Sequence, residues 1–358
     1  MPYARCYGPA VSPQGWCPST YRIHEAPDGG IARVRVPGGV LTPTQVRVLG
    51  VAARRFGNGI IDLTQRANLQ LRGIDLDAGA DLRKLLAPVG LSAPTAVTED
   101  RRNVLASPTA GLDGHEVMDI TAVVGTIVDR IDALPDSVAL PHKVGVLVDG
   151  GGAPSLRAIT LDLSLGATRT AAGAVVLAVA LGTALDDAPP VGFIAAEAGA
   201  AADLVEAVLR MCAMPPGAGT PVRVTNLVRD LGLPAVLDLL APRARVRPAT
   251  ATVARARTTT NRSIAAPLGV HTSRSGHWLC VRPAGPRATG AQFAALADAA
   301  VATEAREIRL TPWRCVIVTG VTGPHQMERD LAPVGWTATP WAADPEPTAA
   351  VQRTGALA

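Results

Sequence analysis

Aromatic residues are scarce in this sequence: they make up 3% of the 358 residues, although 48% of the residues are hydrophobic. The core is therefore expected to be aliphatic, and the chain is long enough for two or three compact units. Lysine is rarer still, because only Lys84 and Lys143 accompany 32 arginines. No basic block with interleaved aromatic residues is present, which argues against a nucleic-acid partner.

Segments that would target or anchor the protein are also missing. No basic start is followed by an apolar run, and the longest apolar stretch, residues 171–185, is too short for a bilayer span. We therefore expect a cytoplasmic protein with no membrane partner. The cysteines are few and scattered, which fits reduced thiols, and no local histidine or cysteine spacing predicts a metal site. They are Cys6, Cys17, Cys212, Cys280 and Cys315.

One segment of about 40 residues occurs twice, at a constant offset of 247 positions. "RVRVPGGVLTPTQVRVLGVAARRFGNG" predicts a strand and then a helix, with Thr42 as N-cap, Pro43 at the first helical position and Gln45 completing a capping box. "IDLTQRANLQLRGI", residues 61–74, predicts two further strands. Residues 280–292, "CVRPAGPRATGAQ", and 308–321, "IRLTPWRCVIVTGV", match these segments without a gap. We therefore expect two copies of one half-unit, forming a pseudo-symmetric pair.

The last of the three strands predicted for the first copy carries an unusual polar face. Leu69 and Leu71 alternate with a polar set that falls on the opposite side. This set comprises Arg66, Asn68, Gln70 and Arg72. An antiparallel sheet often shows water one polar face, so the pattern alone leaves a purely solvated face open. The second copy replaces two of these positions by Cys315 and Ile317, so only the first copy keeps the full set.

Between the copies the sequence predicts a separate α+β region. Residues 116–134 and 195–214 are expected to be helices, and residues 143–165 a hairpin that turns at 149–152. The glycines of that turn precede another strand, which argues against a phosphate-binding loop. Residues 242–266 are expected to form a surface connector with solvated arginines. These are Arg243, Arg245, Arg247, Arg255 and Arg257.

The ordered motifs of this chain resemble the nitrite and sulfite reductase superfamily. They are "RVRVPGGVLTP", "IDLTQRANLQLRGI", "RNVLASPTAGLDGHEVMD" and "LPHKVGVLVDGGG". Within the superfamily, the chain most resembles the precorrin-3B synthase family. This resemblance is carried by the residues of the second motif, by the Lys-x-Gly of "HKVGVLVD" and by the "LTPWR" of the second copy. The resemblance implies an α+β fold in which two ferredoxin-like half-domains form a pseudo-symmetric pair around an inserted reductase-type domain.

The expected boundaries follow from these motifs. The first half-domain covers residues 1–80, the tetrapyrrole-binding domain 85–245, a linker 246–266, the second half-domain 267–325, and a tail 326–358.

The resemblance also implies a function and a site. Members of the superfamily hold a tetrapyrrole that bears several carboxylates, and arginine pairs with carboxylates in a bidentate manner. The polar set of Arg66, Asn68, Gln70 and Arg72 is therefore expected to bind the tetrapyrrole. By resemblance, Arg33, Arg102 and Lys143 match the cationic positions near the reacting centre. Reductases of the superfamily carry a second polar residue where this chain has Gly145, so anion reduction is less expected.

The resemblance further implies a [4Fe–4S] cluster and iron, but the ligand cysteines that the family places after the second half-domain are absent here. We expect no four cysteine sulfurs to share one centre. Three functions remain open. The first is a precorrin-3B synthase-like monooxygenase of aerobic cobalamin biosynthesis, which converts precorrin-3A to its hydroxylated lactone with O2 and an electron-donor protein. The second is a sirohaem-dependent nitrite or sulfite reductase relative. The third is a cluster-less tetrapyrrole-binding protein without catalysis.

Overall fold

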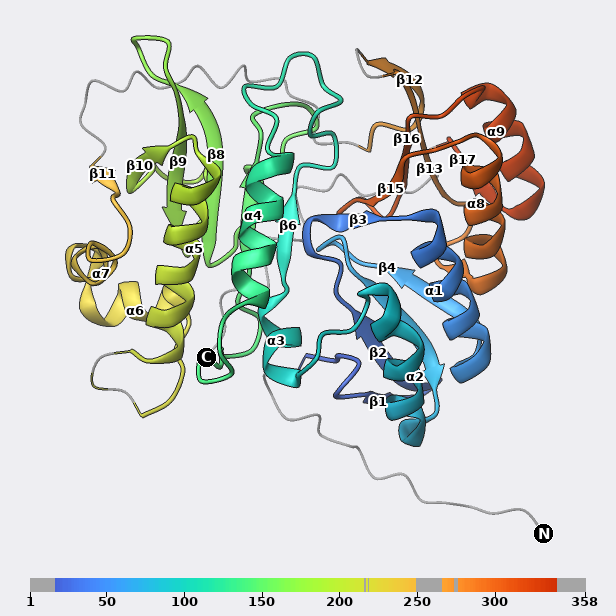
Figure 1. The fold of residues 1–358 in the computed structure, drawn as a ribbon, viewed down its shortest axis with the longest axis horizontal. Coiled ribbons are helices and arrows are strands. Elements are labelled where there is room, and N and C mark those ends of the chain that lie inside the picture. Colours follow the sequence, from blue (N-terminus) through green and yellow to red (C-terminus); the bar gives the residue numbers. More distant parts are fainter. Residues whose placement is uncertain (1–16, 216, 218, 249–265, 274–275, 340–358) are drawn as a thin grey trace.

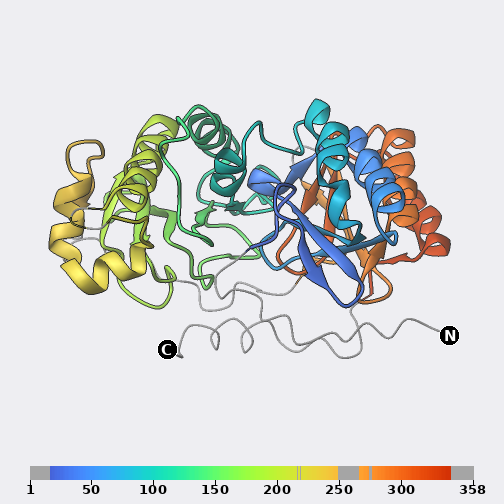
Figure 2. The same ribbon diagram turned by 90° about the horizontal axis from the view of Figure 1, so that it is seen from below.

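The computed structural model describes residues 17–339, apart from 216, 218, 249–265 and 274–275. Its described strands form three sheets, each separately hydrogen-bonded. The two copies of the repeat lie together on the right of Figure 1, and the middle domain lies on the left. Seen from below in Figure 2, most of the helices lie along the upper side of both parts, with strands beneath them, whereas the helices of residues 224–240 (yellow) lie at the lower left. No helix among the described residues is long and apolar enough to cross a membrane.

The first helix of the first copy lies where the sequence predicts, whereas the copy itself continues past its expected end. The capping box of Thr42 and Gln45 is formed, and the helix that it starts ends before Gly57, as predicted. A further helix extends the copy past residue 80, the expected boundary. The elements of this copy are β1 (His24–Ala26), β2 (Gly29–Val34), η1 (Pro37–Gly39), α1 (Pro43–Phe56), β4 (Ile60–Leu63), β5 (Leu69–Ile74), η2 (Leu76–Ala78), α2 (Gly79–Leu86) and η3 (Ala87–Val89).

The second copy repeats this order, and its central elements keep the offset of 247 residues. Thr289 and Gln292 form the second capping box. The copy continues past residue 325, because α9 packs on α8 and β17 pairs with β13, so the expected start of a separate tail at 326 was wrong. Its elements are β12 (Gly269–Ser273), β13 (Gly276–Pro283), α8 (Gly290–Ala302), β15 (Glu307–Leu310), β16 (Val316–Thr319), α9 (Pro324–Leu331), η4 (Ala332–Val334) and β17 (Trp336–Thr337).

The two copies exchange short strands, which confirms the predicted pseudo-symmetric pair. Strand β3 (Val40–Leu41) of the first copy pairs with β15 of the second, and β14 (Ala288–Thr289) of the second copy pairs with β4 of the first. Helices α1 and α8 pack against each other beside these strands. A Cβ atom at Gly50 would lie 2.6 Å from the Gly290 carbonyl oxygen, so glycine permits this close approach.

The middle domain is a six-stranded sheet in the order β11-β10-β9-β8-β7-β6, with α4 and α5 packed on its core. The predicted helix at 195–214 is confirmed by α5, whereas the helix predicted at 116–134 starts only at Thr121. The elements are α3 (Ala96–Arg101), β6 (Val104–Ala106), α4 (Thr121–Asp132), β7 (Val146–Asp149), β8 (Leu163–Arg169), β9 (Val175–Leu181), β10 (Gly192–Ala195), α5 (Ala198–Ala213), α6 (Val224–Leu231), α7 (Leu233–Leu240) and β11 (Arg247–Pro248).

Two expectations for this domain were wrong. Strands β7 and β8 are parallel neighbours, not a hairpin, because residues 150–162 carry the chain back to the starting edge of the sheet. Arg247 lies in β11, which pairs with β10, so the connector begins as part of the sheet. Arg255 and Arg257 lie outside the described residues.

A loop of the middle domain, residues 107–119, is fixed against the second copy. Arg309 of β15 is buried and donates to the carbonyl oxygens of Pro108 and Ala110 at 3.1 and 2.6 Å. Within the loop, the Gly111 amide donates to Glu116 at 2.8 Å. The pKa of Glu116 is raised to about 7, mainly by burial and further by the neighbouring Asp119 and Asp113. The hydrogen bond from Gly111 lowers this pKa but does not cancel the rise.

This raised pKa predicts a pH-dependent stability. The pKa of an unfolded glutamate is about 4.3, so the stabilisation from protonated Glu116 is present below that value and is lost as the pH rises through about 7. Glu116→Gln should be more stable than the wild type at pH 8, by about 1 kcal/mol after allowance for solvent screening, and equal to it near pH 4. Urea unfolding at both pH values measures this, and equal stabilities at pH 8 would contradict it.

Candidate functional site

A cluster of arginines lies where the first copy meets the middle domain, and we call Arg33, Arg35, Arg66 and Arg223 the cationic cluster. Arg33 is on β2, and Arg66 is in the turn between β4 and β5. Burial lowers the pKa of Arg33, and the nearby charges of Arg35 and Arg66 lower it further. The Cys17 thiol, to which Arg33 is hydrogen-bonded, raises this pKa. These mutual effects mean that the charges lie close together.

Arg66 connects this cluster to the middle domain. Its pKa is lowered by burial first and then by the charge of Arg223, while Cys17 and Asp162 act in the opposite direction. Arg223 immediately precedes α6, and its guanidinium donates through Nε and Nη2 to the two carboxylate oxygens of Asp162, at 3.0 and 2.7 Å. Asp162 is fully buried just before β8. The middle domain thus presents an arginine, held by a buried carboxylate, next to Arg66.

Arg33 and Arg66 differ from their neighbours in having no carboxylate of their own. Among the residues that the structure describes, neither guanidinium lies within 4 Å of an acidic side chain, and Arg33 Nε is buried with no hydrogen-bond partner. Arg35, by contrast, lies 3.6 Å from buried Glu99 and 3.3 Å from Asp100. A desolvated cation without a counter-charge is costly, so this arrangement suits an anionic ligand.

The polar set expected on one strand face is divided by the structure. Strand β5 begins only at Leu69, so Arg66 and Asn68 precede it, and the prediction of a single strand carrying all four residues was wrong. Gln70 lies opposite Arg33 in the β2–β5 register and makes no hydrogen bond through its amide to a described residue. Arg72 is neutralised, because it donates to both Asp28 oxygens, at 3.0 and 2.5 Å.

Asn68 has a structural role at the junction of the two parts. It is buried, and its Oδ1 accepts from the Val36 amide at 2.9 Å. Its Nδ2 lies 3.5 Å from Oδ1 of Asn103. The Nδ2 of Asn103 in turn donates to the Val144 carbonyl at 2.9 Å. Through Asn103, Asn68 therefore links the segment that follows β2 in the first copy to the segment that precedes β7 in the middle domain.

The other two predicted cations, Arg102 and Lys143, differ in their contacts. Arg102 donates to the Gly90 carbonyl at 3.3 Å and lies 3.3 Å from Asp132. Lys143 is exposed, has a positive φ of 72°, and makes no ion pair or hydrogen bond within the described ranges. The structure brings Arg33 and Arg66 together, and the convergence of Arg102 and Lys143 on them stays a prediction.

Gly145, next to this junction, has a physical reason to be glycine. A Cβ atom there would lie 2.6 Å from Asn103 Nδ2 and 3.2 Å from Leu161 Cδ2. The Asn103 carboxamide therefore takes the space that a side chain at position 145 would need. The Gly145 amide donates to Asp162 at 3.1 Å, which ties this position to the carboxylate that holds Arg223.

Gly145→Ala should accordingly lower the free energy of unfolding by about 1–2 kcal/mol, because Asn103 must move and lose its bond to Val144. Gly125→Ala is the matched control. Gly125 is inside α4 with no atom within 4 Å of a new Cβ, so alanine there should stabilise the protein by about 0.5–1 kcal/mol. Urea unfolding measures both variants, and a Gly145→Ala protein as stable as the wild type would contradict the steric argument.

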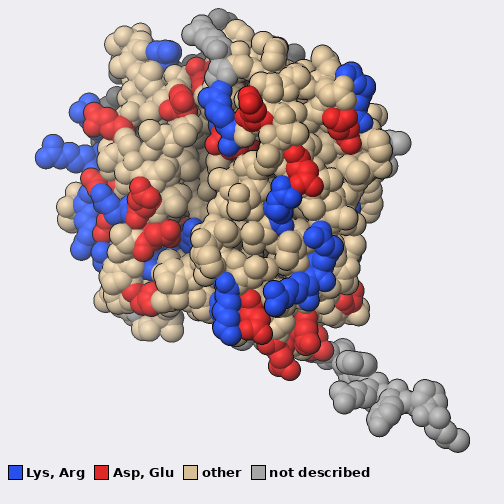
Figure 3. Space-filling view, turned by 45° about the vertical axis from the view of Figure 1, so that its right-hand side comes forward, with Lys and Arg blue, Asp and Glu red and all other residues tan. Residues whose placement is uncertain are grey.

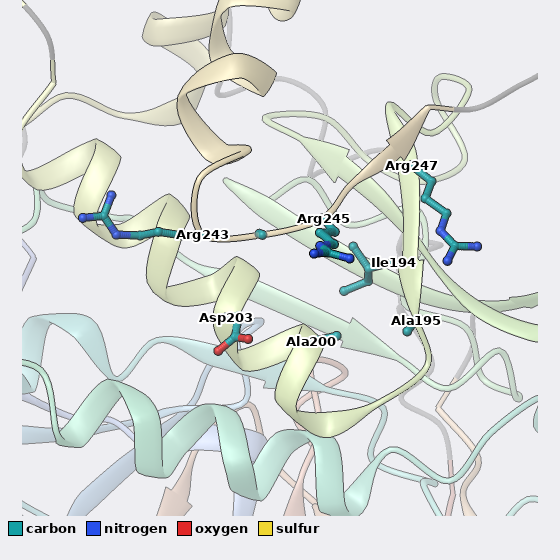
Figure 4. A pocket seen from close by; sticks show the side chains of 8 residues that line it. Ile194, Ala195, Ala200, Asp203, Arg243, Arg245 and Arg247 are labelled. Atoms are coloured by element: carbon teal, nitrogen blue, oxygen red, sulfur yellow. The ribbon is translucent and has the colours of Figure 1, made fainter.

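A second group of arginines lies at the far edge of the middle domain. Arg243, Arg245 and Arg247 line a shallow cavity of about 320 Å³ beside the start of α5. Figure 4 shows their side chains splayed in different directions, with only Arg245 near the centre of the cavity. On the face shown in Figure 3, acidic and basic side chains are interspersed, without a field of one sign. These three exposed arginines fit the solvated role expected from the sequence better than a converging binding site.

Comparison with known proteins gives the family. Residues 23–89 match the nitrite/sulfite reductase ferredoxin-like half domain, and residues 98–246 match the nitrite and sulphite reductase 4Fe-4S domain. Together the matches cover more than half of the chain. The chain belongs to the nitrite and sulfite reductase family. It is 35% identical to a precorrin-3B synthase of Sinorhizobium sp over 185 residues, which are 52% of this chain and 39% of that protein.

Other relatives are reductases. A ferredoxin–nitrite reductase of Leptolyngbya laminosa is 34% identical over 37% of this chain and 27% of its own length. The NirA protein of Mycobacterium tuberculosis has the same fold, with a TM-score of 0.70 and 22% identity over 87% of this chain and 57% of that chain. The compared segments are therefore less than two thirds of the length of these relatives.

The iron–sulfur cluster named in the matching family does not fit the described residues. Four of the five cysteines are described, and all four are buried, with no disulfide among the described residues. Only two of them, Cys280 and Cys315, are in contact. No group of three or more His, Cys, Asp or Glu side chains in the described ranges could hold a metal ion. Cys6 lies outside these ranges, so the expectation that no four cysteine sulfurs share one centre stays a prediction.

Proposed function

We propose that the cationic cluster binds the carboxylates of a tetrapyrrole, and that the protein is a precorrin-3B synthase-like oxidoreductase. The observation that carries the proposal is the half-buried pair of Arg33 and Arg66, which have no carboxylate within ion-pair distance among the described residues. A tetrapyrrole with several rim carboxylates supplies the counter-charges that this pair needs. The 35% identity to a precorrin-3B synthase over half of the chain supports the choice of substrate.

Each residue of the site has a role in this proposal. Arg66 and Arg33 pair with carboxylates, and the side-chain amide of Gln70 beside Arg33, which bonds to no described residue, adds a donor. Arg223 approaches from the middle domain, already oriented by Asp162, so that less freedom is lost on binding. The polar groups of Arg72 and Asn68 already form hydrogen bonds within the protein, so these two residues stabilise the conformation of the site.

Binding is tested by titrating the protein with an octacarboxylate porphyrin, followed by the Soret absorbance and by fluorescence quenching. The octamethyl ester of the same porphyrin is the matched control, because it keeps the ring and removes the charges. The acid should bind at least tenfold more tightly than the ester, and its affinity should fall with salt concentration. Equal affinities for the two would contradict a carboxylate site.

Catalysis needs a second experiment. With precorrin-3A, O2 and a reducing system based on ferredoxin, the proposed monooxygenase should yield a product that has gained one oxygen atom, measured by mass spectrometry. Arg33, Arg102 and Lys143 are the residues proposed, by resemblance, to act near the reacting centre. Tight porphyrin binding without any oxygen gain would favour the non-catalytic binding protein. Reduction of nitrite or sulfite would favour the reductase alternative, which the relatives also suggest.

A further inference from the structure

Two buried thiols meet in the second copy, at positions that the proposed function does not use. Cys280 is on β13, and Cys315 directly precedes β16. Their sulfur atoms are 3.4 Å apart, and both side chains are fully buried. The sequence has only five cysteines in 358 residues, so contact between two that are 35 positions apart is a specific feature of the fold.

The pair occupies a distinctive place in the repeat. At the offset of 247 residues, Cys280 corresponds to Arg33 and Cys315 to Asn68, two positions of the first copy that carry polar groups at the junction with the middle domain. The alternate positions of β13 and β16 are ordinary aliphatic core, such as Leu279. The thiols therefore replace polar residues on the sheet face that the middle domain covers.

The surroundings of the pair favour a reaction between its members over a reaction with other groups. The face is closed by Leu112 of the middle-domain loop, together with Trp278 and Ile317. The Thr311 hydroxyl lies 3.0 Å from the Cys315 sulfur. Among the described cysteines, the other two are too far from the pair to form a sulfur–sulfur contact. A disulfide needs a sulfur–sulfur distance of about 2.0 Å. Cys280 lies opposite Ile317, so Cys315 is its diagonal neighbour, and closing the gap from 3.4 Å requires backbone movement as well as side-chain rotation.

We propose that Cys280 and Cys315 are a redox-active dithiol, which peroxide or a small disulfide oxidant converts to an intrachain disulfide. With hydrogen peroxide, one thiol takes an oxygen atom to give a sulfenic acid and water. The second thiol then attacks the sulfenic sulfur, forms the S–S bond and releases a second water. Two electrons pass from the sulfurs to the peroxide, and a dithiol reductant reverses the change.

The site does not favour fast oxidation. Burial raises the pKa of Cys280, and the neighbouring Cys315 raises it further, so the reactive thiolate is scarce while the sheet is closed. The reaction therefore requires small oxidants and brief opening of this edge of the sheet, where β12 covers β13. The formed bond is protected by the same burial.

The test uses the full chain, reduced and then exposed in its folded state to hydrogen peroxide or to oxidised dithiothreitol. Remaining thiols are labelled with N-ethylmaleimide in denaturant and counted by intact-mass spectrometry. The label count should fall from five per chain to three on oxidation and return to five after reduction. Peptide mapping of the oxidised protein should find a Cys280–Cys315 cross-link. After oxidation, the Cys280→Ala variant should still carry labels on all four of its remaining thiols. The Cys212→Ala variant, which lacks a buried thiol elsewhere, should lose two of its four labels.

The labels also define the contrary result. Five labels after oxidation, or a cross-link that joins other cysteines while Cys280 and Cys315 stay labelled, would overturn the proposal. Peptide mapping of the wild type decides this even if a variant fails to fold. The experiment is independent of tetrapyrrole binding, so its outcome does not depend on the proposed function.

Discussion

Replacing Asp162 by alanine is expected to lower the free energy of unfolding by about 3 kcal/mol, the range for removing one partner of a buried ion pair. Asp162 is fully buried and accepts from both Nε and Nη2 of Arg223 and from the Gly145 amide. The substitution would leave the Arg223 charge without its partner and the Gly145 amide without an acceptor. Urea unfolding at pH 7 measures the loss.

The matched control is Asp230→Ala, which removes an acidic residue that is also bonded to an arginine through two nitrogens. Asp230 pairs with Arg229 at 2.7 Å, but both side chains are more than half exposed, so no change in stability is expected. Asp162→Ala should also weaken binding of the octacarboxylate porphyrin, because Arg223 is no longer oriented toward Arg66. Similar small losses for both variants would show that burial of Asp162 does not matter.

Much of the fold could be predicted because its signals are local and occur twice. A capping box fixes the start of a helix within four residues, and both boxes are formed at the predicted threonines. The constant offset then required that the two copies share one topology. The exchange of β3 and β14 was beyond this reasoning, since a two-residue strand carries too little periodicity to reveal its partner.

The middle domain shows where local patterns fail. Strands β7 and β8 were predicted to form a hairpin because an apolar run, a glycine turn and a second apolar run look alike in either direction. Their parallel pairing depends on residues 150–162, which have no helical periodicity to signal a crossover. In the same way, the alternation around Leu69 predicted that Arg66 and Asn68 lie in a strand, whereas a turn with Ala67 at positive φ precedes it.

The candidate site was only partly predictable for a related reason. Arg33 and Arg66 belong to motifs that could be recognised, but Arg223 lies 157 residues after Arg66, in a segment without a pattern. Asp162 is a charged residue within an apolar alternation, which is a weak signal of a buried ion pair. Arg72 matched the polar face yet is neutralised by Asp28, a partner that only the folded turn between β1 and β2 brings close.

Arg66→Ala is expected to weaken binding of the octacarboxylate porphyrin by about 1.5–3 kcal/mol, or roughly 10- to 150-fold, the range for a hydrogen bond to a charged group. Arg66 is half-buried and has no carboxylate within ion-pair distance among the described residues, so its charge is available to a ligand. Titration by Soret absorbance measures the change. The free energy of unfolding should not fall, because the substitution removes a desolvated and unpaired cation.

Arg66→Lys separates charge from geometry at the same position. Lysine keeps the positive charge but loses the planar fork that pairs with both oxygens of a carboxylate, so its affinity should lie between those of the wild type and the alanine variant. Arg229→Ala, which removes an exposed cation elsewhere on the middle domain, should leave affinity unchanged and excludes a general effect of net charge. If Arg66→Ala and Arg66→Lys both bind the porphyrin as the wild type does, the arginines of this cluster serve the fold and not a ligand.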